Sequence, residues 1–299
     1  MSDMLTHWAV FEDCRRLALL DNRVDRALAG IMHDEREFAR LGALARAGEF
    51  FVPHILNLAR NAPRRGNNSA LLRRKLAFAL GGITHYAADA IMKPLAKAKT
   101  QADWNEGHWQ MQRGDGAPDS AIREVSAYYD THVFRKVYLE GQEEPFNRFL
   151  LADNHTQPGR AMEAFVRALF QRSLLASHTL APDKGDIDGW LDNLLTRVQP
   201  LYVNVETYVK VFAHPDPAKM RAYGVEDAFY LESDPAIRLA RRAQAGKHIG
   251  GSAILADLAE AKNTSAYAKA VCRGLERLRD ASRFWCGASA VTPDLRQGA

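Results

Sequence analysis

The sequence predicts an all-α protein, and three observations carry that prediction. Apolar residues recur every three or four positions through almost the whole chain, as at Leu72, Leu76 and Leu80. Strand-like alternation of apolar and polar residues is nearly absent, and capping residues stand where apolar stretches begin. We therefore expect a single all-helical domain over residues 1–299, with more than half of its residues in helices.

The expected helices follow one another along the chain with short connections. Ser69 is expected to cap one long helix, and Pro94 to end it. Asp119 and Ser120 are expected to cap the next helix, and Asp234 to begin a later one. To within a few residues, the expected helices cover 5–20, 23–32, 35–46, 50–61, 70–92, 119–140, 158–180, 186–213, 234–246, 251–261 and 264–285.

Between Pro94 and Pro118 the sequence is less regular and holds Trp104, His108 and Trp109. This composition is typical of a functional loop. One hypothesis is that His108, beside Trp109, lines a substrate entrance, and the alternative is an ordinary loop histidine.

Composition and charge exclude several classes of protein. The 40 basic and 36 acidic residues give a formal net charge of +4, too small to indicate a nucleic-acid or membrane partner. Three cysteines without a CxxC pair indicate neither a cysteine zinc site nor a disulfide framework. The first residues do not form a signal peptide, and His85 and Asp89 interrupt the most apolar window. A cytoplasmic protein without a transmembrane segment is therefore expected.

The sharpest chemical signal is an apolar stretch in which His85 and Asp89 stand four residues apart. That spacing places both side chains on one helix face, which must point inward because the neighbouring leucines need burial. A buried imidazole and a buried carboxylate both need partners. One suitable partner is a divalent metal such as zinc. The other interpretation is a His–Asp hydrogen bond inside a helical core, without a metal.

The residues LGGITHYAADA at 80–90, with Pro94 after them, resemble the metal-binding helix of the zinc-dependent phospholipase C family. That family is all-α, is related to the fungal zinc nucleases specific for single strands, and hydrolyses phosphoesters with a cluster of zinc ions. The resemblance implies that His85 and Asp89 are metal ligands and that His7, in the first helix, is another. It covers about residues 1–140, whereas the helical part from about 141 to 299 is unassigned. We expect the three side chains to point at one common location inside the fold.

The chain also departs from the family pattern. The residues RLGA at 40–43 are similar to a segment that precedes a metal-binding Asp in the family, but here Glu49 is the first acidic residue after them. Leu95 and Ala96 occupy the place of a second family His beyond Pro94, and His54 is a weaker candidate ligand. The metal site is then smaller, or is assembled from other residues, or has been lost.

Glu124 and Asp130, in the helix expected near 119–140, are candidate replacement ligands. They are six residues apart and lie on two flanks of that helix, so both reach a metal only if it sits above the helix. The alternative makes them solvated charges, because Tyr128 and Tyr129 mark the apolar side. His132 shares that stripe and is expected to be a hydrogen-bonded core histidine.

Together these features predict a zinc-dependent phosphoester hydrolase resembling phospholipase C. Its substrate is expected to be a phosphoester small molecule, a lipid head group or a nucleotide, and no residue is assigned as general acid. No nucleophile elbow and no Walker motif occurs, which disfavours a serine hydrolase or an NTPase. The alternative is a catalytically degenerate binding or assembly module on the same helical scaffold. The predicted ligands of one to three zinc ions are His7, His85, Asp89, Glu124 and Asp130.

Overall fold

The chain is mostly helical over the part that the computed structural model describes. That part is residues 4–45, 48–62, 69–100, 117–138, 207, 210–247, 249 and 263–295. Of these residues 77% are helical and none lies in a strand, which confirms the predicted all-α class. The elements, in chain order, are α1 (Met4–Ala18), α2 (Arg26–Asp34), α3 (Arg36–Gly42), α4 (Gly48–Asn61), α5 (Ser69–Thr100), α6 (Ala117–Val137), α10 (Pro217–Ala222), the π-helical turn η4 (Val225–Phe229), α11 (Pro235–Gln244) and α13 (Ala266–Trp285).

Each predicted helix that falls on the described residues is present. The helices predicted at 158–180 and 251–261, and most of the one at 186–213, lie outside the described residues. The structure adds α10 and η4, which the sequence reading missed. Both are too short to show a periodic apolar pattern, so hydrophobic spacing carries no signal for them.

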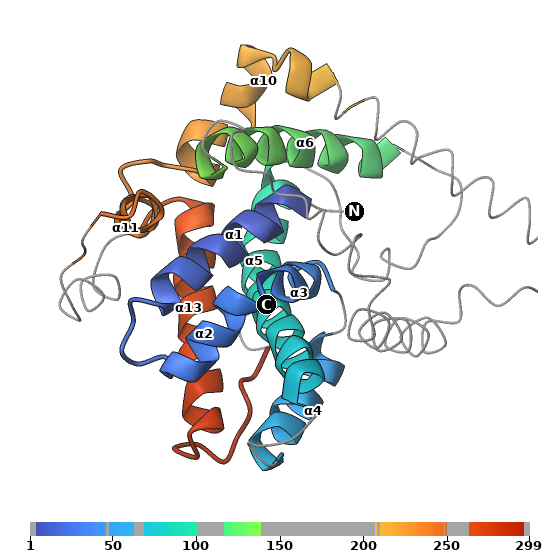
Figure 1. Ribbon diagram of the computed structural model, residues 1–299. Coiled ribbons are helices and arrows are strands. Elements are labelled where there is room, and N and C mark those ends of the chain that lie inside the picture. The colour runs from blue at the N-terminus through green and yellow to red at the C-terminus, as the bar shows by residue number, and fades with distance from the viewer. Residues whose placement is uncertain are drawn as a thin grey trace, which may run out of the picture.

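Helix α5 is the centre of the bundle. It packs along α13 and against α3 and α4, and it also contacts α1 and α2. In Figure 1, α5 and α13 run side by side while α6 lies across their upper end, next to α1. The middle of α5 is therefore enclosed by helices, and the apolar residues of its central turns are fully buried.

Two glycines allow α3 and α5 to cross at close range. A Cβ on Gly42 would lie 1.9 Å from the Phe78 carbonyl oxygen, and a Cβ on Gly81 would lie 1.9 Å from the Ala39 carbonyl oxygen. No other residue fits at either position without separating the two backbones. Glycine inside a helix costs about 1 kcal/mol relative to alanine. The close packing of the end of α3 against the middle of α5 compensates for this loss of helix stability.

Pro94 does not end α5, contrary to the prediction, and the helix continues to Thr100. A proline inside a helix lacks the N–H that closes the preceding turn. The residues from Pro94 to Thr100 are held by packing instead, because Ala96 is buried and Leu95 lies against the core. The first seven residues of the predicted irregular loop, 94–100, therefore belong to α5, and its candidates Trp104, His108 and Trp109 lie outside the described residues.

Two predicted caps behave differently from expectation. Helix α6 begins at Ala117, so Asp119 and Ser120 fall inside it and do not precede it. Asp234 stands at the N-cap of α11 as predicted, but its carboxylate makes no capping bond there. It accepts hydrogen bonds from the backbone N–H groups of Thr264 and Ser265, at 3.0 and 2.9 Å. Asp234 therefore ties the start of α13 to the start of α11.

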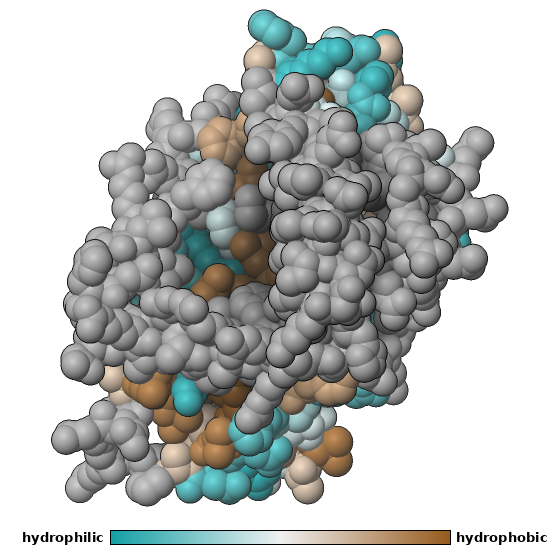
Figure 2. All heavy atoms as spheres, turned by 90° about the vertical axis from the view of Figure 1, so that its right-hand side faces the viewer, coloured by the Kyte–Doolittle hydropathy of each residue, from teal (hydrophilic) through white to brown (hydrophobic). Residues whose placement is uncertain are grey.

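The described surface is mixed in character. Phe50 and Leu58, on α4, are among its few exposed large apolar side chains. Figure 2 shows apolar and hydrophilic residues side by side on the lower part of one face. Among the helices that the structure describes, none has the length and apolar character needed to cross a bilayer.

Candidate metal centre

Two histidines and an aspartate meet inside the bundle, and we call His7, His85 and Asp89 the His–Asp cluster. Nε2 of His7 lies 3.2 Å from Oδ1 of Asp89, and Nε2 of His85 lies 3.3 Å from Oδ2 of the same carboxylate. The two imidazole rings are stacked, with their centroids 4.5 Å apart. One ligand-type atom from each residue lies within 4.8 Å of the others, so the cluster can hold a metal ion. The predicted convergence of these three side chains is confirmed.

Helix α1 presents His7 to the cluster, and the residues on either side of His7 fix that helix. The backbone N–H and the hydroxyl of Thr6 both donate to Oδ1 of Asp130, each at 2.8 Å. The indole N–H of Trp8 donates to the carbonyl of Arg40 at 2.8 Å. These bonds tie the start of α1 to α6 and to α3. His7 is consequently positioned by two other helices and not by α1 alone.

The close crossing of α3 and α5 orients His85. Nδ1 of His85 lies 2.9 Å from the carbonyl oxygen of Ala43, the residue that follows α3. A carbonyl at a helix end has no partner within its own helix, so it is available to accept. Because a carbonyl only accepts, the N–H of a neutral His85 lies on Nδ1 and its lone pair on Nε2. A backbone carbonyl behind a histidine in this way is the usual arrangement at metal sites.

The charges of the cluster leave a place for a cation. Burial lowers the pKa of His85, and the nearby His7 lowers it further, whereas the contacts with Asp89 and Ala43 raise it without reversing the shift. Burial alone would raise the pKa of Asp89, but its contacts with His7 and His85 outweigh burial and hold that pKa well below its usual range. In its neutral form, with the N–H on Nδ1, His85 directs the Nε2 lone pair at a carboxylate oxygen of Asp89. A positive charge close to both atoms stabilises such a contact, and a proton on Nε2, the ammonium of Lys93 or a metal ion can supply it.

Lys93 already supplies one positive charge at this point, and the sequence reading missed it. Its Nζ lies 2.7 Å from Oδ2 of Asp89, one helical turn away, and its side chain is 36% exposed. The signal was present in the sequence, because His85, Asp89 and Lys93 stand at successive four-residue intervals on one helix face. Lys93 is thus the part of the site nearest to solvent.

Glu124 and Asp130 are not brought into the His–Asp cluster. Glu124 accepts a hydrogen bond from the Tyr223 hydroxyl at 2.8 Å and forms an ion pair with Lys219. Asp130 is fully buried and accepts a hydrogen bond from the backbone N–H of Thr6, in the first turn of α1. The two carboxylates leave α6 on different sides, as their six-residue spacing indicates. Neither the metal role predicted for Glu124 nor that predicted for Asp130 has a geometric basis in the described residues.

The weaker candidates also lie apart from the cluster. Glu49 accepts a hydrogen bond from the hydroxyl of Tyr86, whose ring in turn meets His85 edge-on. His54 is exposed on α4. His132 is buried, as predicted for a core histidine, but its Nε2 has no hydrogen-bond partner among the described residues. Within the described part of the chain, the expected hydrogen bond of a core histidine is not made at Nε2.

Comparison of the chain with family models, curated proteins and solved structures finds no match in any of the three.

Proposed function

We propose that this chain is a metal-dependent phosphoester hydrolase of the phospholipase C type, with one zinc ion bound by His7, His85 and Asp89. One observation carries the proposal. Nδ1 of His85 is committed to the Ala43 carbonyl at 2.9 Å, so its Nε2 lone pair faces the Asp89 carboxylate at 3.3 Å. Two lone pairs turned to each other inside a helical bundle fit a cation between them.

The donor set suits a catalytic zinc site and not a closed structural one. Two imidazoles and one carboxylate give three protein ligands, which leaves a fourth tetrahedral position for water or substrate. Zinc in such a site supplies a water that ionises near neutral pH and polarises a phosphoryl oxygen. The chain supplies the orientation, because backbone and helix contacts hold both histidines before any substrate arrives.

The positive charge of Lys93 favours an anionic substrate such as a phosphoester. Its ammonium is bound to Asp89 and is partly exposed, so it can turn from that carboxylate toward an anionic oxygen at the entrance. A compact ammonium is a common phosphate-binding group in proteins. This chemistry is shared by a nucleotide, a lipid head group and a small phosphodiester, all of which carry the same anionic group.

The second candidate function is a binding or assembly module without catalysis, and Lys93 is also the observation that favours it. An ammonium 2.7 Å from Oδ2 of Asp89 provides the positive charge of the cluster without a metal. The His–Asp cluster is then a structural hydrogen-bonded group that joins α1 to α5. The two candidates differ in whether Asp89 holds zinc or only Lys93 and the imidazoles.

Metal content and hydrolysis of a simple phosphodiester separate the two candidates. The full chain is purified without chelator, its zinc is measured by mass spectrometry, and bis(p-nitrophenyl) phosphate is used as substrate. About one zinc per chain is expected, with hydrolysis that a chelator removes and added zinc restores. A folded chain without zinc, and without hydrolysis when zinc is added, contradicts the hydrolase and supports the module.

A matched pair of variants assigns the ligand. His85→Gln removes an imidazole from the cluster and is expected to abolish zinc retention and hydrolysis. Glu124→Gln is the control, because Glu124 contacts Lys219 and Tyr223 and lies outside the cluster. It should retain both properties. Loss of zinc in Glu124→Gln with retention in His85→Gln would contradict the proposed ligand set.

A further inference from the structure

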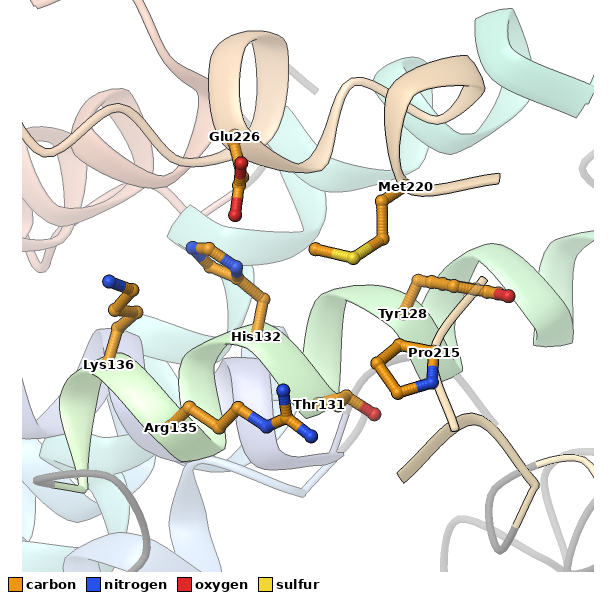
Figure 3. Close-up of a pocket in the computed structure, with 8 residues that line it drawn as sticks. All are labelled: Tyr128, Thr131, His132, Arg135, Lys136, Pro215, Met220 and Glu226. Carbon is orange, nitrogen blue, oxygen red and sulfur yellow. The ribbon is translucent and has the colours of Figure 1, made fainter. Parts of the chain in front are cut away.

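A second site lies on the other side of α6 from the His–Asp cluster. A cavity of about 220 Å³ opens between α6, α10 and η4. In Figure 1, α10 and α1 lie on opposite sides of α6, so that helix separates the cavity from the candidate metal centre. Figure 3 shows the side chains that line it, which are Tyr128, Thr131, His132, Arg135, Lys136, Pro215, Met220 and Glu226.

His132 brings a polar nitrogen to this cavity that nothing else in the described chain satisfies. The residue is only 6% exposed, and its Nε2 has no hydrogen-bond partner among the described residues. The ring meets Tyr230 edge-on at 5.0 Å, which fixes its orientation without satisfying the nitrogen. A buried polar group left in this state costs about 1–3 kcal/mol. A molecule that bonds to Nε2 would remove that cost.

Charges of opposite sign lie on two sides of the His132 ring. Figure 3 shows the Glu226 carboxylate directed toward the ring from η4, and the Arg135 guanidinium on the other side, beside Thr131. Arg135 makes one long hydrogen bond, to the Phe212 carbonyl at 3.4 Å. Arg135 and Glu226 do not pair with each other in the described structure. The cavity therefore has a cationic end and an anionic end.

The rest of the lining carries no unbalanced charge. Lys136 forms an ion pair with Glu232 at 2.6 Å, so its charge is balanced outside the cavity. Met220, Pro215 and the ring of Tyr128 form an apolar wall near the cationic end. An occupant that satisfies all of these groups needs an anionic group, a cationic group and an apolar side chain.

We propose that this cavity binds a free α-amino acid with a medium-sized apolar side chain. Its carboxylate bonds to Arg135, its ammonium to Glu226 and to Nε2 of His132, and its side chain contacts Met220. The size agrees, because a cavity of about 150 Å³ takes one benzene molecule and 220 Å³ leaves room for a few more atoms. A nucleotide, a lipid or a peptide is too large for this volume, since sites for drug-sized ligands span about 300–1,000 Å³.

Calorimetric titration of the full chain with three related compounds tests the proposal. L-leucine carries both charges, N-acetyl-L-leucine carries only the carboxylate, and L-leucine methyl ester carries only the ammonium. L-leucine is expected to bind at millimolar concentration or below, and each blocked compound about tenfold more weakly. Equal binding of L-leucine and N-acetyl-L-leucine overturns the proposal in favour of a simple anion site. Absence of binding by L-leucine up to about 10 mM overturns the site altogether.

Two variants show which charge meets which end of the ligand. Glu226→Gln should weaken L-leucine about tenfold and leave N-acetyl-L-leucine unchanged. Arg135→Gln should weaken both. Asp227→Asn is the control, because Asp227 is exposed like its neighbour Glu226 on η4 but does not line the cavity. An equal effect of Asp227→Asn and Glu226→Gln overturns the assignment of the ammonium end.

Discussion

Helix α1 contributes to two buried charged groups that are built on opposite principles. His7 enters the His–Asp cluster, and Glu12, roughly one and a half turns later, enters what we call the Glu12 network. Glu12 is fully buried and meets Arg15 at 3.0 Å, Arg36 at 2.6 Å and Arg40 at 2.7 Å. Both groups take a carboxylate out of water. Their partners differ, since guanidinium surrounds Glu12 and imidazole surrounds Asp89.

The difference decides which group is a structural element and which is a candidate site. A guanidinium stays protonated at every relevant pH, so the charge of Glu12 is neutralised by the protein itself. A neutral imidazole brings a lone pair and no charge, and among the described residues Asp89 is left with Lys93 as its charged partner. Buried carboxylates with arginines hold a fold together, whereas a buried carboxylate with imidazoles can exchange one cation for another.

The largest expected effect is the loss of stability in Glu12→Gln. The substitution leaves several guanidinium groups around a neutral amide, and breaking a buried ion pair costs about 3–5 kcal/mol. Urea denaturation of the full chain measures this loss. Glu37→Gln is the control, because Glu37 also pairs with Arg40, at 3.0 Å, but at the edge of the network. It should cost about 1 kcal/mol or less. Equal costs would show that the network does not depend on Glu12.

The second expectation is acid sensitivity of the same network. Burial alone would raise the pKa of Glu12, but Arg15, Arg40 and Arg36 outweigh burial and lower the pKa to about 2. The folded chain thus binds the proton more weakly than the unfolded chain, whose pKa is near 4.5. The stabilisation is complete above that value and is lost as the pH falls from 4.5 toward 2. It amounts to about 3 kcal/mol, at about 1.4 kcal/mol per pH unit.

Comparison with the variant isolates this contribution. The difference in unfolding free energy between the parent chain and Glu12→Gln should shrink steadily from pH 4.5 to pH 2. Titrating groups away from the network act on both proteins alike, including His132, whose pKa burial lowers to about 4. A difference that stays constant over this interval would contradict the lowered pKa.

Sequence reasoning succeeded where one helix sets the geometry. His85 and Asp89 belong to one helix, so their spacing alone placed them on one inward face, and the apolar residues around them fixed which face that was. The prediction of an all-α fold rested on the same period. The family resemblance added His7, whose position across the bundle no spacing could supply.

Sequence reasoning failed where the partner lies far away in the chain. The contacts of Glu124 come from Lys219 and Tyr223, on and just after α10, a helix too short to be predicted. The Ala43 carbonyl that orients His85 is a backbone atom, which leaves no mark on residue identity. The prediction that Pro94 ends the helix was wrong because the missing N–H of a proline is visible in the sequence, whereas the packing that compensates for its loss is not.

The third expectation concerns the exchangeable cation. Asp89→Asn keeps the size of the side chain and removes its charge, so zinc affinity should fall at least about tenfold. Zinc should raise the melting temperature of the parent chain and not that of the variant, with nearly unchanged helical content in both. If the cluster is purely structural, the variant loses about 1–3 kcal/mol of stability, and zinc and chelator leave the melting temperature of both proteins the same.

The smallest expected effect tests whether the ammonium of Lys93 and a zinc ion compete for Asp89. Lys93→Met removes the ammonium that contacts Oδ2 of Asp89 and keeps an unbranched side chain of similar reach. Zinc no longer has to displace a competing positive charge, so its affinity should rise about threefold to tenfold, within the range for a partly exposed ion pair. Lys97→Met is the control, since Lys97 is exposed one turn further along α5. Competitive titration with a zinc-binding dye measures both variants. Weaker zinc binding in Lys93→Met than in Lys97→Met would mean that Lys93 supports the metal and does not compete with it. Asp89 would then not exchange the Lys93 ammonium for zinc, and the proposed contrast with the permanent arginine partners of Glu12 would be wrong.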